Sequence, residues 1–214
     1  LLQKRVDGLI ISSAVDKSDN IVLIKKSNVP FVLIDRKVAG ANSYVVSDNY
    51  NGAKTVVKYL VKLGYKRIGF IGGKADTNIH KERRKGYMDA LKETGLKYNP
   101  IAEISLGFDK ESGKKAMRML LELKKVSNAV FAANNFLALG AIEILREKNI
   151  KNIALAEFDY ADFDRIGDTT VISAIQDTGK IGEKSAEILL DKISGGKDKK
   201  IVLPVKLITS KTEA

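Results

Sequence analysis

The sequence has no cysteine and a single histidine, His80. The missing cysteines exclude a disulfide framework, a thiolate nucleophile and a cysteine-based zinc site. One histidine leaves little from which to build a Ser-His-Asp triad or a histidine-rich metal site. Since no nucleophile–base pair or metal cluster is evident either, we expect a protein that is not an enzyme and uses no metal and no cofactor.

Long apolar runs are also missing. No run approaches the ~20 residues that a membrane-spanning helix needs. The first residues, LLQKRVDGLIISS, lack the long apolar core and the small-residue cleavage site of a signal peptide. Together with the absence of cysteine, this favours a reducing, cytoplasmic setting and no membrane partner.

The chain is basic, with a formal net charge of +11. Such a balance raises the prospect of a nucleic-acid partner. The lysines are scattered, however, and only GGKDKK at 195–200 is a dense cluster. Aromatic residues do not interleave with the basic ones as a stacking platform requires. We therefore interpret most of the charge as solvated helix faces and a solvated loop.

Short apolar runs alternate with stretches of helical periodicity along all 214 residues, enough for one large domain or two small ones. The runs are continuously apolar, which is typical of a parallel sheet covered on both faces by helices. Right-handed crossovers would make the fold a doubly wound α/β fold. The predicted strands are 6–12, 29–35, 43–47, 67–73, 101–107, 129–134, 153–159, 171–176 and 201–208, and the predicted helices include 80–95, 111–124, 136–148 and 178–194.

Polar residues stand at the carboxyl ends of several predicted strands. At this edge of an open parallel sheet, strand ends and helix N-termini converge and ligands bind. In AVFAANN (129–135), for example, Asn134 would lie on the ligand edge, and Asn135 would begin or cap the next helix. Carboxylates and amides at several strand ends favour a polyhydroxy ligand. The strand-end residues are Asp35, Ser47, Asn134, Asp159 and Gln176.

Each of these residues has a second interpretation. Asp and Asn at strand ends often cap the following helix or form an Asx-turn. Phe108 follows another strand end and could offer a flat apolar face to a ligand, or it could be a loop aromatic that packs into the core.

The segment 71–87 adds two arginines. GGKA at 72–75 is not a phosphate loop, because the glycine spacing is wrong and no Ser or Thr follows the lysine. Arg83 and Arg84 open a predicted helix, where the helix dipole disfavours cations. We therefore expect a partner for at least one of them, either a strand-end carboxylate or an anionic ligand group. The alternative, a solvated basic turn, fits Arg84 better than Arg83.

The motifs then form a recognisable order. Together they resemble the effector-binding core of the LacI/GalR family of bacterial transcription regulators over essentially the whole chain. They are VDGLIIS, VPFVLIDR, VSDNYNGAKTVVKYLVKLGYKRIGFIGG, RRKGYMDAL, AVFAANNFLALGA, IQDTGKIGEKSAEILL and IVLPVKLI.

The resemblance implies two Rossmann-like subdomains of the periplasmic-binding-protein type I, with a small-molecule effector in the cleft between them. The first would comprise 1–47 and 178–205, and the second 48–177 and 206–214. Matching motif positions implies that the effector contacts are Asp35 of IDR, Ser47 before the DN pair, Arg83 of RxxGY, Phe108, Asn134 of the AND motif, Asp159 of the FDD motif, and Gln176.

The chain departs from the family pattern at several points. Asn135 replaces the usual Asp of AND, Glu157 and Tyr160 replace a Gly and an Asp of GFDD, and VISA replaces Pro-Leu-Thr-Thr. The helix-turn-helix domain and the first strand–helix–strand of the core have no counterpart in the 214 residues. We therefore expect a first subdomain that is truncated at its N-terminus and a polypeptide that does not bind an operator specifically by itself.

The resemblance implies a ligand-sensing and dimerisation domain that binds a sugar or related polar metabolite. It would form a homodimer and reach operator DNA only through the upstream helix-turn-helix domain. Asp35, Asp159, Asn134 and Arg83 favour a neutral or anionic polyol over a purine. Two alternatives stay open: a solute-binding protein of a transport system, and a regulator controlled by a phosphorylated carrier protein.

Overall fold

The computed structural model describes residues 6–14, 16, 18–73, 77–125, 127–159 and 169–210. The chain divides into two compact units. Unit 1 comprises Leu1–Asp48 and Asp177–Pro204, and unit 2 comprises Asn49–Gln176 and Val205–Ala214. The chain therefore passes from one unit to the other three times, after Asp48, after Gln176 and after Pro204.

Unit 1 is a parallel sheet with a helix on each face. Its strand order is β1 (Leu9–Ser12), β2 (Phe31–Ile34), β3 (Tyr44–Ser47) and β9 (Lys200–Leu203), and its helices are α1 (Asp19–Lys26) and α6 (Thr178–Ile193). Because side chains alternate across a strand, Phe31 and Leu33 pack with Ile21 of α1, whereas Val32 packs with Ile181 of α6. Both faces of the sheet are thus covered by apolar contacts.

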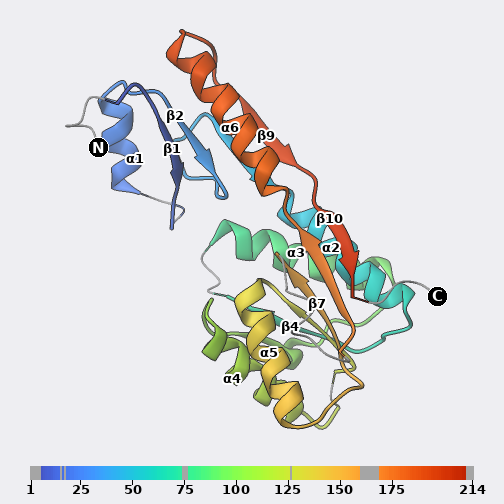
Figure 1. Cartoon of the computed structure of the whole chain (residues 1–214). Helices are drawn as coiled ribbons and strands as arrows, with labels where there is room; N and C mark the ends of the chain where they lie inside the picture. Colours follow the sequence, from blue (N-terminus) through green and yellow to red (C-terminus); the bar gives the residue numbers. More distant parts are fainter. Residues whose placement is uncertain are drawn as a thin grey trace. The chain divides into compact units, whose positions relative to one another are not determined.

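Unit 2 holds a six-stranded sheet (Figure 1). Its strand order is β10 (Lys206–Thr209), β8 (Val171–Ile175), β7 (Ala154–Phe158), β6 (Ala129–Ala132), β4 (Ile68–Gly72) and β5 (Glu103–Ser105). Its helices are α2 (Asn49–Lys62), α3 (Asn78–Glu93), α4 (Lys110–Leu121) and α5 (Asn135–Glu147), with a short 3-10 turn, η2 (Pro100–Ala102), before β5. The helices pack in pairs, α2 with α3 and α4 with α5.

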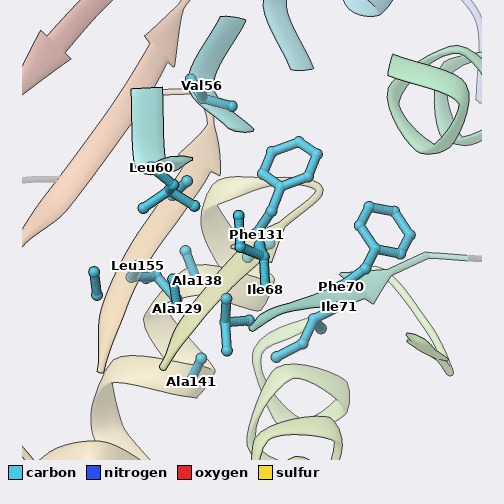
Figure 2. Packing of buried hydrophobic residues seen from close by; sticks show 14 of the residues in the cluster. Val56, Leu60, Ile68, Phe70, Ile71, Ala129, Phe131, Ala138, Ala141 and Leu155 are labelled. Carbon is cyan, nitrogen blue, oxygen red and sulfur yellow. The ribbon is translucent and has the colours of Figure 1, made fainter. Parts of the chain in front are cut away.

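The core of unit 2 is built on the apolar strands that the sequence predicts. Figure 2 shows Phe70 and Phe131 among residues of α2 and α5. Phe70 stacks on Tyr87 of α3 with the ring centroids 5.1 Å apart, and the centroids of the Phe70 and Phe131 rings are 5.6 Å apart. The Tyr87 hydroxyl donates to the Ile68 carbonyl at 2.8 Å, so the polar end of this buried ring is satisfied. Burial raises the pKa of Tyr87 well above its usual range.

The fold class is confirmed as an α/β fold dominated by parallel sheets, with two local departures. The last predicted strand, 201–208, is wrong as a single element, because it divides at Pro204 into β9 in unit 1 and β10 in unit 2. Proline has no N–H to donate to a strand ladder, so the pairing ends there. β10 also pairs antiparallel with β8, at the edge of an otherwise parallel sheet.

Two helices of unit 2 are followed by glycines. Gly64 and Gly95 follow α2 and α3 with φ of 91° and 74°, the left-handed backbone that glycine adopts without strain. None of the helices in the described part of the chain combines the length and the apolar composition that a membrane crossing needs.

The close packing of α4 on α5 generates a first prediction. A Cβ at Gly140 would overlap the backbone of α4 at Lys110 and Lys114, whereas a Cβ at the exposed Gly182 of α6 would meet no atom within 4 Å. Gly140→Ala should therefore lower the free energy of unfolding by about 1–3 kcal/mol through overpacking. Gly182→Ala should raise it by about 0.4–1 kcal/mol, because it restricts only the unfolded chain.

Urea unfolding followed by circular dichroism measures both variants. Equal effects of the two substitutions would show that α4 and α5 do not approach as closely as this packing requires.

Candidate functional site

The polar strand-end residues of unit 2, Asn134, Asp159 and Gln176, follow β6, β7 and β8, which are neighbours in the sheet. Hydrogen bonds connect Asp159 to Gln176, and an arginine links Asp159 to the backbone carbonyl that follows β6. The connecting group is the guanidinium of Arg83, which α3 carries in its second turn and which is only 3% exposed. A guanidinium stays protonated in proteins, so burial obliges the fold to supply partners for its charge.

Arg83 finds those partners on three other elements. Its Nε donates to Oδ1 of Asn49, the first residue of α2, at 2.8 Å. Its Nη1 donates to the Ala133 carbonyl at 2.5 Å, just after β6, and lies 3.4 Å from Oδ2 of Asp159, just after β7. The guanidinium carbon also lies 3.6 Å from the centre of the Phe158 ring. The side chain is thus fixed by a carboxylate, two neutral oxygens and an aromatic face.

Asp159 joins the arginine to Gln176. Its Oδ2 faces Arg83, and its Oδ1 accepts a hydrogen bond from Nε2 of Gln176, the residue after β8. Asp159 is thus a strand-end carboxylate of the kind expected as a partner for an arginine, and only one of its oxygens faces Arg83 because the other is turned to Gln176. The Asp159 backbone has a φ of 81°, and its N–H donates to the Ala174 carbonyl at 3.0 Å. The carboxylate is therefore aimed by a left-handed backbone conformation that Asp adopts more readily than most residues.

Asn134 and Phe108 form the other half of this edge. Asn134, not Asn135, caps α5: its Oδ1 accepts from the Leu137 N–H at 2.8 Å, while Asn135 begins the helix. Its Nδ2 donates to the Phe108 carbonyl at 3.2 Å and so fixes the loop after β5. The Phe108 ring lies over Gly73, where any Cβ would overlap it, and it is 38% exposed. Phe108 is therefore a surface aromatic and not a core residue.

The other two predicted contacts lie in unit 1. Asp35 follows β2 with a φ of 66°. The N–H of the next residue, Arg36, donates to the carbonyl of the preceding residue, Ile34, at 2.7 Å, so Asp35 is the central residue of a tight γ-turn. Ser47 ends β3 and is buried, with a relative exposure of 1%. Asp35 and Ser47 thus stand at strand ends of one parallel sheet, as predicted, and their part in ligand binding stays a prediction.

The sequence reasoning missed three features of this edge. It did not single out Asn49 or Phe158, which contact Arg83, and it did not relate Gly73 to the position of Phe108. Phe158 directly precedes Asp159 in the sequence, and this position was a signal that an aromatic ring could cover the end of the strand. Asn49 depends on the packing of α2 against α3, which no local signal reveals.

Arg84 is partly exposed, but it also has a partner, which the alternative of a solvated basic turn did not include. Its Nε donates to Oε1 of Glu103 at 2.5 Å, and Tyr98 donates to the other oxygen at 2.5 Å. Burial raises the pKa of the Glu103 carboxyl, but the hydrogen bonds from Arg84 and Tyr98 outweigh it, and the pKa lies below its usual value. Both arginines therefore have partners, and Arg84 is directed to the β5 strand rather than to the site.

The departures from the family motifs have different positions. Glu157 is fully buried in β7, in register with Ala132 and Ser173 on the neighbouring strands. VISA forms most of β8, and Tyr160 lies outside the described residues. In the ranges that the structure describes, no group of three or more His, Asp or Glu side chains could hold a metal ion.

The fold and this edge define a class: an α/β ligand-binding protein with two units and with polar side chains at the carboxyl ends of parallel strands. Residues 1–211 match the family model described as "Periplasmic binding proteins and sugar binding domain of LacI family". The chain belongs to this family.

A named relative agrees with this assignment. The chain is 30% identical to the HTH-type transcriptional repressor PurR of Actinobacillus pleuropneumoniae serotype 3 (strain JL03) over 197 residues, which cover 90% of the chain and 59% of the repressor. The chain thus spans less than two thirds of that relative. The relative is a transcriptional repressor and not an enzyme, in line with the expectation from the sequence.

Solved structures show the same fold. A complex of the transcriptional regulator CelR with cellobiose has a TM-score of 0.85 and 28% identity, covering 96% of this chain and 65% of the other. A putative transcriptional regulator LacI from Bacillus cereus subsp. cytotoxis NVH 391-98 has a TM-score of 0.81 and 28% identity, covering 97% and 76%.

The burial of Arg83 generates a stability prediction. Arg83→Ala would leave the Asn49 amide oxygen, the Ala133 carbonyl and the Asp159 carboxylate without their cation. We expect it to lower the free energy of unfolding by about 3–5 kcal/mol, the scale for breaking a buried charge pair. Arg84→Ala, at a side chain that is 36% exposed, should cost about 1 kcal/mol. Urea unfolding checks both, and an Arg83→Ala midpoint equal to that of the wild type would contradict the role of the guanidinium.

The Glu103 carboxyl generates a pH prediction. Its folded-state pKa is below its usual value of 4.5, so its stabilising effect is present above that value and is lost as the pH falls through the folded pKa. The wild type should exceed Glu103→Gln in stability by on the order of 1 kcal/mol at pH 6. This difference should shrink below about pH 4.5. Thermal unfolding from pH 6 to pH 3 measures it, and a difference that grows towards low pH would contradict the assignment.

Proposed function

We propose that the chain is the effector-binding core of a LacI-family transcription regulator, and that the strand ends of unit 2 hold a small polar ligand. The observation that carries the proposal is the hydrogen-bonded series Arg83–Asp159–Gln176, which lies at the same edge of the sheet as the exposed ring of Phe108. The buried cation fixes the Asp159 carboxylate, whose side chain is 26% exposed. A partly exposed carboxylate in a fixed orientation is a pre-organised acceptor for ligand hydroxyls.

The ligand class that fits best is a sugar or a related polyol. A carboxylate and two amides pair with neighbouring hydroxyls as donors and acceptors, and Phe108 offers a flat apolar face for the carbon skeleton. Arg83 is already engaged with three protein oxygens, which favours a neutral ligand over an anionic one. The CelR–cellobiose complex, at 28% identity, supports a sugar.

The whole protein's activity follows from the same proposal. Ligand binding would favour one conformation of the regulator over another and so alter its affinity for operator DNA. We propose that it works in the cytoplasm as a homodimer and contacts the operator through a helix-turn-helix domain, in keeping with relatives named as HTH-type repressors. Those names also favour a regulator over a transport protein. Asp35 and Ser47 stay predicted contacts from unit 1.

A thermal-shift screen against sugars, sugar phosphates, sugar acids and nucleobases tests the proposal. A ligand at ~100 times its dissociation constant should add about 2.7 kcal/mol of stability, which raises the melting midpoint. No shift with any member of the panel would count against a small-molecule effector.

Variants then locate the ligand. Asp159→Asn keeps the side-chain shape at the left-handed backbone but removes the charge, and Gln176→Ala removes the neighbouring amide. Each should weaken binding by more than ~1.5 kcal/mol, the scale for charge-assisted hydrogen bonds. Asp89→Asn is the matched control, because its carboxylate belongs to the same unit but pairs with Lys85 and accepts from Tyr50, outside the Arg83–Asp159–Gln176 series. Calorimetry in which Asp159→Asn binds like Asp89→Asn would remove Asp159 from the site.

A further inference from the structure

The opposite edge of the unit 2 sheet is strongly basic. There the helices α2 to α5 end and lead into β4, β5, β6 and β7. The last turns of these helices and the connections that follow carry eleven cationic side chains, all exposed, and three glutamates. We call this set the basic edge: Lys62, Lys66, Arg67, Lys92, Lys97, Arg118, Lys124, Lys125, Arg146, Lys148 and Lys151, with Glu93, Glu122 and Glu147.

Helix dipoles explain only part of this charge. Cations are favoured at helix C-termini, where each dipole is equivalent to roughly −0.5 of an elementary charge. Four helices therefore offset only about two positive charges out of a surplus of about eight. Two of the glutamates are also engaged, Glu93 by Lys54 and Lys58 of α2, and Glu147 by Arg118. Among the described residues, the basic edge thus carries a surplus of about eight positive charges, in a chain whose formal net charge is +11.

A cavity of about 440 Å³ opens within the basic edge. Among the described residues, its lining combines two cations, two amides and a hydroxyl with an apolar floor and includes no carboxylate; these residues are Arg67, Lys148, Asn128, Asn152, Ser127, Leu121, Ile150 and Ile153. A larger cavity, of about 600 Å³, lies beside α3, but there the carboxylates of Glu103 and Asp89 already pair with Arg84 and Lys85. Of these two cavities, only the smaller one has a lining of cations without carboxylates.

The walls of this cavity are held by the backbone. The Arg67 N–H donates to Oδ1 of Asn128 at 3.0 Å, and the Arg67 carbonyl accepts from the Asn128 N–H at 2.9 Å. The Asn128 carbonyl in turn accepts from the Ala154 N–H at 3.2 Å. Because Oδ1 of Asn128 is occupied by a protein donor, its Nδ2 is the end of the amide that can serve a ligand. That end is a donor, as an anion requires.

We propose that this cavity binds a small anion that carries phosphate, with Arg67 and Lys148 as the charge partners and Asn128 as a neutral donor. A guanidinium and an ammonium with amide and hydroxyl donors are the groups that recognise phosphate oxygens. The volume is within the range of small-molecule sites, so a phosphate ester or pyrophosphate fits better than a single small ion. The surrounding positive charge would concentrate anions at the opening.

The structure favours a small anion over a nucleic acid. The aromatic residues near this edge, Tyr59, Tyr65 and Tyr98, are partly buried and pack against the core, so they form no stacking platform. The site is also independent of the proposed effector site, because the two lie at opposite ends of the same parallel strands. Binding at each can therefore be measured separately, and failure of one proposal is distinguishable from failure of the other.

Titration calorimetry of the full chain with inorganic pyrophosphate tests this proposal, with glycerol 3-phosphate in parallel to distinguish a polyphosphate from a phosphate ester. The double substitution Arg67→Gln with Lys148→Gln should lower the affinity for the more tightly bound probe by about tenfold or more, since two charge-assisted hydrogen bonds are lost. Lys92→Gln with Lys97→Gln removes the same charge from the basic edge outside the cavity. It should change the affinity by less than about threefold, because it acts only through the screened field.

Three results would overturn the proposal. The first is no saturable binding of either probe at millimolar concentration, and the second is equal weakening of binding in the two double variants. The third is displacement of the probe by duplex DNA, with the same salt dependence for binding of the probe and of the DNA. The last two would indicate a diffuse polyanion surface instead of a site. All four substituted side chains are exposed, so unfolding is not expected, and thermal melting of each variant verifies this.

Discussion

The arrangement of unit 2 depends on one buried charge. Arg83 cannot release its proton, and it lies where water does not reach it. Its partners come from the start of α2, the end of β6 and the end of β7, so the charge is stable only when these elements are assembled around α3. The same requirement fixes the Asp159 carboxylate and, through it, Gln176. A demand for charge compensation in the interior thereby produces an ordered polar edge at the surface.

The fold was largely predictable because its signals are local. Continuous apolar runs marked the strands, and stretches of helical periodicity marked the helices between them. The exceptions arise where the local pattern and the strand pairing differ: the run 201–208 around Pro204 is apolar except for Lys206, yet its halves belong to different sheets. The positions of Asp159 and Gln176 at strand ends were equally predictable from the sequence. The partners of Arg83 and Arg84 were not, because Asn49 and Glu103 reach them only through packing between elements distant in the sequence.

The two edges of the unit 2 sheet have opposite chemistry for a common geometric reason. A parallel sheet gathers all helix N-termini at one edge and all helix C-termini at the other. The carboxyl edge of the strands holds Asp159, Asn134 and Gln176, whose acceptor groups suit helix N-termini. The other edge gathers lysines and arginines beyond what the dipoles require. The topology thus separates acceptor and donor surfaces on one unit without any long-range charge pattern in the sequence.

The left-handed backbone at Asp35 and Asp159 limits how this protein can diversify. In the described part of the chain, every residue with positive φ other than glycine is Asn or Asp. A β-branched or bulky replacement at either position would be strained whatever the ligand gained from it. At the proposed site of unit 2, heritable changes of ligand preference should therefore accumulate at positions with ordinary backbones, such as Phe108 and Gln176, while Asp159 alternates among Asp, Asn and Gly. The backbone conformation thereby divides this edge of unit 2 into a position that few residue types can occupy and positions that can vary.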